Sequence, residues 1–198
     1  MPRPRLLEDG LVLDRALTVF WRRGYAATSV RELSQATGLG AAALYNRFTD
    51  KDGLFVEALH RYAEEGMTRR LARLSALADP ARAITGYLDE LIDLSVKDEA
   101  RCGCMLVNTA LDGATVPPAA LEFVRRCFGE IEAFFHIQLR RLDLAGAGID
   151  LAALEQSLFS AMVTIRVLAR LDPDRERLQR VADSALTPLL RHRKALAH

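Results

Sequence analysis

The residues from Ala27 to Phe55, ATSVRELSQATGLGAAALYNRFTDKDGLF, constrain the fold of this chain more than any other stretch. Thr28 is a good N-cap for a short helix, and Glu32 lies where a capping partner can reach back. Gly38 is expected to end this helix, because glycine adopts left-handed backbone angles at little cost. A second short helix follows from about Ala41 to Arg47. Two short helices joined by a tight turn that contains glycine predict a helix-turn-helix.

The second helix of this unit has a composition that suits DNA. A helix-turn-helix lays its second helix in the major groove, with the N-terminal residues toward base edges. Small alanine side chains let the backbone come close, and polar or basic side chains reach phosphates and bases. A cation at the start of the next helix can hold a phosphate. The residues predicted to bind DNA are therefore Thr28, Arg31, Ala41, Ala42, Ala43, Tyr45, Asn46, Arg47 and Lys51. The alternative is a plain pair of core helices in which alanine serves helix propensity.

The same run resembles the DNA-binding segment of the TetR family of bacterial transcriptional regulators. The resemblance covers about residues 10 to 60, through the runs T-S-V-R-E-L, A-T-G-L, A-L-Y-N-R-F and D-K-D-G-L-F. It implies an all-α fold of about nine helices, with a DNA-binding head over residues 1–53 and a helical ligand-binding and dimerisation body over residues 54–198. Two departures are Gly40, where many members have Ser, Thr or Pro, and the lack of Lys or Arg near Ala41. These departures keep open a helical protein-interaction module without specific DNA binding.

The resemblance also implies a function, namely a cytoplasmic repressor that leaves a palindromic operator when an effector acts on it. The expected partners are operator DNA, a small-molecule or electrophile effector and a second copy of the chain. The last two long helices, from about residue 150 onward, are apolar on more than one face, and such helices need a partner for the second face. We therefore predict a homodimer through them, and monomers when Leu158 and Met162 become charged. Pro188 is expected to kink or end the last helix.

The run C-G-C-M-L-V-N, which starts at Cys102, suggests how the body could sense a signal. Its Gly-Cys-x-x-Val-Asn part resembles a subset of TetR-like regulators, some of which respond to electrophiles or oxidants through the cysteine, here Cys104. A cysteine at a helix N-terminus feels the positive end of the helix dipole, which favours the thiolate. Arg101 could help. The alternative is a cysteine that only fills space in the core.

A small-molecule pocket is the other candidate sensor. Such pockets have apolar walls and a few polar groups. The candidate sensor and lining residues are Tyr87, Cys104, Asn108, Phe123, Phe135, His136 and Met162. The alternative for the aromatic residues is an ordinary core.

Composition excludes several other classes of protein. No apolar run reaches the roughly 18 residues that a membrane span needs, so no membrane partner is expected. Three cysteines argue for a reducing cytosol and against a disulfide scaffold. Residues 1–51 carry a formal charge of +3 in a chain whose net charge is +1, which suits a basic head. No catalytic motif, metal site or cofactor is predicted, although Cys104 and His136 could be drawn as a nucleophile and its base.

Overall fold

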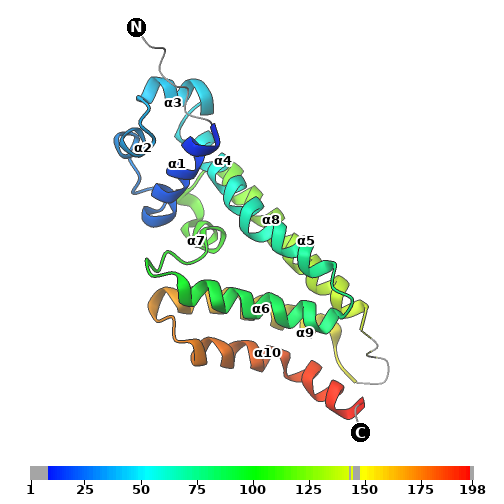
Figure 1. The fold of residues 1–198 in the computed structure, drawn as a ribbon. Coiled ribbons are helices and arrows are strands. Elements are labelled where there is room, and N and C mark those ends of the chain that lie inside the picture. Colours follow the sequence, from blue (N-terminus) through cyan, green and yellow to red (C-terminus); the bar gives the residue numbers. More distant parts are fainter. Residues whose placement is uncertain (1–8, 143, 145–147, 197–198) are drawn as a thin grey trace.

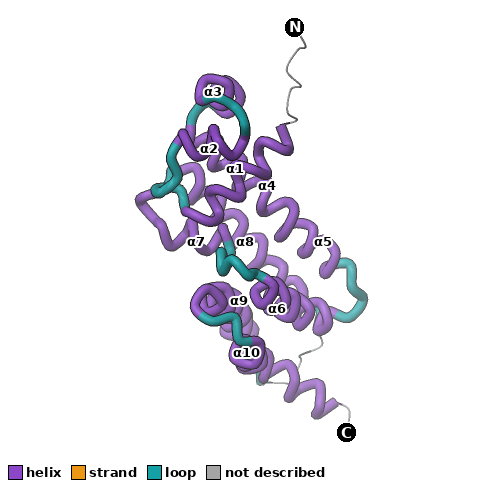
Figure 2. Tube along the Cα trace, turned by 60° about the vertical axis from the view of Figure 1, so that its left-hand side comes forward, coloured by secondary structure: helices purple, strands orange, loops and turns teal. Residues whose placement is uncertain are grey.

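The computed structural model describes residues 9–142, 144 and 148–196, and these residues form helices and loops without any strand (Figure 2). The α-helices are α1 Asp9–Arg23, α2 Val30–Thr37, α3 Ala41–Phe48, α4 Lys51–Ala63, α5 Arg69–Ser75, α6 Pro80–Lys97, α7 Met105–Asp112, α8 Pro118–Arg140, α9 Leu151–Leu171 and α10 Arg175–Leu196. Counted with α4 and α5 as one rod, the described residues hold nine helices, so the all-α prediction is confirmed.

The first three helices form a small head at one end of the molecule (Figure 1). Val12, Ala16 and Phe20 are spaced four apart on α1 and are almost fully buried, which is the pattern of a helix with one apolar face. This face packs on α2 and α4. Leu33 and Leu44 are buried on the inner faces of α2 and α3 in the same core, where α3 contacts α2 and α4.

The N-cap of α2 is Ser29, and the prediction of Thr28 was wrong. The Ser29 hydroxyl accepts from the Glu32 N–H, and the Glu32 carboxylate accepts from the Ser29 N–H at 2.8 Å, a complete capping box. Thr28 is buried and donates its hydroxyl to the Gly24 carbonyl at 2.7 Å. Both residues are good caps, and the S-x-x-E spacing selects Ser29, since a capping partner lies three residues after its cap.

A continuous rod connects the head to the body. α4 passes into α5 through a π-helical turn, Glu64–Thr68, and Figure 1 shows the rod descending from the head. Asp50 caps its start, since its carboxylate accepts from the Gly53 N–H at 2.7 Å. A side chain at residue 53 would lie 2.3 Å from the Phe48 carbonyl oxygen, so the α3–α4 turn needs glycine there.

The body packs α6 against α5, α8, α9 and α10, with α9 also in contact with α8 and α10. Tyr87 on α6 is buried against Phe134 and Phe135 of α8, with ring centroids 5.5 and 5.1 Å away. Pro188, which was expected to kink or end the last helix, does not end α10, because the helix continues to Leu196. Leu186 and Leu189 beside it are buried, and this packing offsets the hydrogen bond that proline removes.

Candidate nucleic-acid interface and body cavity

The outer face of α3 is exposed on the head. Ala41, Ala42, Ala43 and Asn46 are exposed, while Leu44 turns inward. Gly40, the N-cap of α3, provides no side-chain cap. The helix therefore presents its small residues and its N-terminal end outward, the geometry that an approach to a DNA groove requires.

Lys51 lies at the N-terminus of α4, next to this face. Its Nζ lies 4.2 Å from the centroid of the Tyr25 ring, and the Tyr25 hydroxyl donates to the Asp52 carboxylate. Burial lowers the pKa of Lys51, and burial together with the Asp52 contact raises the pKa of Tyr25 to about 12. Tyr25 is thus a neutral donor at ordinary pH, and it holds Lys51 and the start of α4 together.

The other predicted DNA-binding residues fall into different environments. Arg31 is exposed on α2, whereas Tyr45 and Arg47 are half-buried on α3. The side chain of Thr28 is buried against the Gly24 carbonyl, as described above, so it presents no free hydroxyl at this surface. Arg3 and Arg5, which contribute to the positive charge of residues 1–51, lie outside the described residues.

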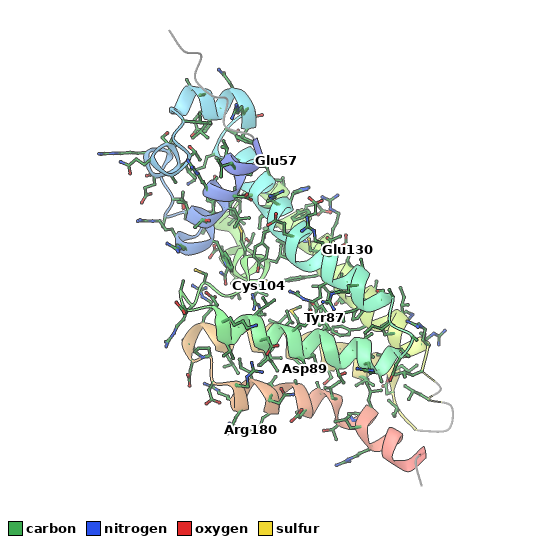
Figure 3. The ribbon with its side chains drawn as sticks, in the orientation of Figure 1. Glu57, Tyr87, Asp89, Cys104, Glu130 and Arg180 are labelled. Atoms are coloured by element: carbon green, nitrogen blue, oxygen red, sulfur yellow. The ribbon has the colours of Figure 1, made fainter. Side chains whose placement is uncertain are left out.

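A cavity of about 600 Å³ opens between the head, the rod and the body. Leu17 and Trp21 of α1 form the wall on the side of the head, Tyr62 comes from the rod, and Leu106 and Phe128 come from α7 and α8. Part of the π-helical turn, including Met67, also lines it. Tyr87 and Cys104 line this cavity, and both are labelled in Figure 3.

Arg166 is the buried charge of the cavity. It is 6% exposed, donates to the Ser95 hydroxyl at 2.9 Å and to the Gly103 carbonyl at 3.1 Å, and lies within hydrogen-bonding reach of Tyr62 and Cys104. Burial raises the pKa of Tyr62 well above its ordinary value, so this phenol stays neutral.

Gly103 joins the cavity to the head. Its carbonyl accepts from Arg166 and also from the Trp21 indole N–H at 3.0 Å, while its own N–H donates to Asp98 at 2.8 Å. The loop before Cys104 is thereby tied to α1 on one side and to α9 on the other.

The sequence pattern of "Bacterial regulatory proteins, tetR family" matches residues 12–58. The fold is similar to that of the TetR family transcriptional regulator CifR, solved as a cysteine mutant complexed with a 26bp double-strand operator DNA. That similarity has a TM-score of 0.80 and 30% sequence identity over 93% of this chain and 98% of CifR. The chain belongs to the TetR family.

Two curated relatives agree with this assignment. The uncharacterized HTH-type transcriptional regulator YezE of Bacillus subtilis is 29% identical over 96% of this chain and all of its own length. The HTH-type transcriptional repressor ComR of Escherichia coli is 34% identical, over 54% of this chain and 51% of its own length. The protein is accordingly a TetR-family DNA-binding transcriptional regulator, and the relatives are regulators and not enzymes.

The cavity of this TetR-family protein contains only some of the residues predicted to line it. Tyr87, Cys104 and Met162 line the cavity as predicted. Asn108 donates instead to the Cys102 carbonyl at 2.8 Å and accepts from Arg170 at 3.1 Å, which fixes the loop before Cys104.

Three aromatic predictions are revised because these side chains are absent from the cavity wall. Phe123 stacks on His60 with 3.9 Å between ring centroids, and Phe135 is fully buried against Tyr87. His136 is exposed, with its Nδ1 3.0 Å from the Glu155 carboxylate, and it is not beside Cys104 at the cavity. Helical spacing indicates that a face is buried, but not whether it meets a cavity or another helix.

Sequence reasoning missed Arg166 and Trp21. Arg166 is a charged residue inside the most apolar part of α9, and this interruption was the available signal. The basic residue predicted to lie near Cys104, Arg101, is exposed and donates to the Leu171 carbonyl. Of the described helices, α9 alone is long and apolar enough to cross a membrane by length and composition. This is weak evidence, because a core helix passes the same test.

Proposed function

We propose that the protein is a cytoplasmic repressor that binds a palindromic operator as a homodimer and is released when a small molecule enters the cavity or Cys104 is modified. The observation that carries the proposal is the composition of the cavity wall. Leu17 and Trp21 belong to the head, while the facing residues belong to the rod and body. An occupant of such a cavity changes the contacts between the two parts, and an effector shifts an equilibrium by such differential contacts.

The head is proposed to cover residues 1–53 and the body residues 54–198. In the head, α3 would enter the major groove through Ala41, Ala42, Ala43 and Asn46. Arg31, Tyr45, Arg47 and Lys51 would contact phosphates or bases. The exposure of the α3 face supports the first assignment, and the place of Lys51 at a helix N-terminus supports the second.

The link from cavity to head is proposed to run through Gly103. Its carbonyl receives hydrogen bonds from Trp21 on α1 and Arg166 on α9. A change in the loop before Cys104 would weaken one or both bonds and let α1 shift. Two heads that no longer match the half-site spacing of about 34–36 Å would lose operator affinity.

Cys104 is proposed as the reactive residue among the three cysteines. It is the N-cap of α7, is partly exposed and lines the cavity beside Arg166. Cys102 and Cys127 are buried, and burial raises the pKa of the Cys127 thiol to about 12, which disfavours its thiolate. The Gly-Cys-x-x-Val-Asn run would then define a subset of the family with a common sensor loop, in which Asn108 holds the loop.

The test is operator binding by the purified protein, using the DNA that flanks its own gene. Binding is measured with thiols reduced and again after a mild oxidant or a quinone. Loss of binding in the parent and retention in Cys104→Ser supports a thiol sensor. If operator binding is unchanged by the oxidant or quinone, release is assigned to a non-covalent ligand. If the protein does not bind the operator in any state, the proposal is contradicted.

Lys51→Ala provides the matched test of the DNA contact. It should weaken operator and unrelated DNA alike and lower the salt slope of log affinity by about 1, since one phosphate contact is lost. Lys97→Ala, at the C-terminus of α6, is the control and should leave the slope unchanged. An unchanged slope in Lys51→Ala would remove Lys51 from the contact set.

A further inference from the structure

Arg166 is a buried cation that lacks a carboxylate partner. Two of its nitrogens bond to neutral acceptors, the Ser95 hydroxyl and the Gly103 carbonyl. Its Nε has no hydrogen-bond partner, and no Asp or Glu of the described residues forms an ion pair with it. Burial of an unpaired charge is costly, so a native protein keeps one where a partner compensates it.

The carboxylates on the cavity wall are already engaged elsewhere. Glu90 contacts Arg70 and Arg73 at 3.3 and 2.6 Å. Glu65 lies 2.8 Å from Arg61, and Asp98 accepts from the Gly103 N–H. Arg166 is therefore left without a carboxylate partner among the described residues of the wall, beside the phenol of Tyr62 and the thiol of Cys104.

The rest of the wall is largely apolar. Leu17, Trp21, Leu106, Phe128 and Met162 supply aliphatic and aromatic surface, and the volume of about 600 Å³ falls within the range of small-molecule sites. A wall of this kind accepts a hydrophobic body, while a guanidinium favours a carboxylate or another oxyanion.

We propose that the cavity binds an organic anion with a hydrophobic body, and that Arg166 receives its negative charge. This inference rests on the proposed function, because it assigns the ligand class of the same cavity. It adds a charge requirement that a purely hydrophobic or neutral effector would not meet.

A matched pair of fluorescent probes tests the charge requirement on the full-length protein without DNA. 8-Anilinonaphthalene-1-sulfonate carries a sulfonate, and N-phenyl-1-naphthylamine has the same aromatic body without it. We expect the anion to bind about 10- to 100-fold more tightly, because its charged group pairs with a buried guanidinium. Equal or tighter binding of the neutral probe would overturn the inference.

Trp21 reports where the probe binds. It is the one tryptophan of the chain and lies on the cavity wall. We expect the anion to quench Trp21 emission with the same midpoint as its own fluorescence increase. An unchanged Trp21 emission at saturation would place the probe outside the cavity and contradict the inference.

Arg166→Gln identifies the residue, with Arg69→Gln as the matched control. Arg69 also lines the cavity but is exposed at its mouth. Arg166→Gln should lose most of the preference for the anion and keep the affinity for the neutral probe, whereas Arg69→Gln should resemble the parent. If Arg166→Gln and Arg69→Gln lose the preference for the anionic probe equally, that preference comes from the overall positive potential of the cavity, and the role of Arg166 is overturned.

Folding and function are separated by two further measurements. Circular dichroism and thermal unfolding test whether Arg166→Gln is folded. If the variant does not fold, the relative affinity of the parent protein for the two probes decides whether the cavity requires an anion. Operator binding is assayed separately, so a failure to bind DNA rejects the proposed function while leaving the probe result intact. A protein that binds operator but prefers the neutral probe rejects the ligand class alone.

Discussion

At the scale of single residues, Gly103 combines a left-handed backbone conformation with a close approach to a neighbouring helix. Its φ of +72° lies in the left-handed region, and an added Cβ would lie 2.7 Å from Arg170 Cγ. Its carbonyl and N–H are both engaged, with Trp21, Arg166 and Asp98. Only glycine allows the loop to approach α9 this closely while it bonds to α1.

Gly103→Ala should therefore lower the free energy of unfolding by more than backbone strain alone would. Gly113 has φ and ψ of 52° and −123°, a combination that side chains disfavour, with open space around it, so Gly113→Ala measures a backbone penalty without a clash, which we expect to be about 1–3 kcal/mol. Gly103→Ala should lower the free energy of unfolding by about 2–4 kcal/mol, because the contact with Arg170 adds to that penalty. Urea unfolding at pH 7 compares the two, and equal losses would mean that Arg170 moves aside freely.

At the scale of elements, α2 is held at its start by more than helix propensity. Glu32 accepts from the Ser29 N–H and hydroxyl, and its carboxylate lies 2.6 Å from Arg23 on α1. The hydrogen bonds from Ser29 lower the pKa of Glu32, with the Arg23 charge acting in the same direction. The capping box thus joins α2 to α1 and contributes to the orientation of the head.

This arrangement predicts a pH dependence. Because the folded-state pKa of Glu32 is lowered, its stabilisation is present above the ordinary glutamate pKa of about 4.3 and is lost as pH falls through the folded value. Glu32→Gln removes the titration but keeps a side chain that can cap. Unfolding of parent and variant should differ at pH 7 and converge in acid. Glu57→Gln, at an exposed position on α4, is the control, and a difference that persists at low pH would reject the assignment.

At the scale of the whole molecule, the outer face of α9 and α10 determines how two copies could associate. Leu158 and Met162 are buried inside the subunit, so charging them would test folding and not the dimer as first predicted. The open face instead carries small polar residues, including Ser160 and Thr164. They share this face with Arg180, which is labelled in Figure 3. Small residues let helices approach closely, which suits a second copy there.

The double variant Ser160→Arg with Thr164→Arg should be a monomer. The two long cations add bulk and charge to a face that already holds Arg177 and Arg180. Light scattering after size exclusion measures the mass, and operator affinity should fall with it because one head cannot occupy both half-sites. Ala133→Arg, an exposed position on α8, is the control. A double variant that stays dimeric would move the proposed interface elsewhere.

Part of this architecture could be read directly from the sequence. The positions of α2 and α3 and the all-helical class follow from caps, glycines and spacing over four or five residues. Such signals are local, and each helix carries its own. The error at Thr28 was also local, because two adjacent residues could both cap. At Pro188 the helix did not end, since packing of Leu186 and Leu189 outweighed one lost hydrogen bond.

The sequence by itself determined that the chain is helical, that its first helices form a DNA-reading unit and that a cysteine begins α7. The tertiary structure alone decided what surrounds that cysteine. Arg166 and Trp21 meet at the Gly103 carbonyl from positions 63 and 82 residues away, and no local pattern encodes such a meeting. It depends on which faces of α1, α7 and α9 pack together. Burial of apolar side chains determines which face of a helix turns inward, and the arrangement of the other helices determines which side chains that face contacts.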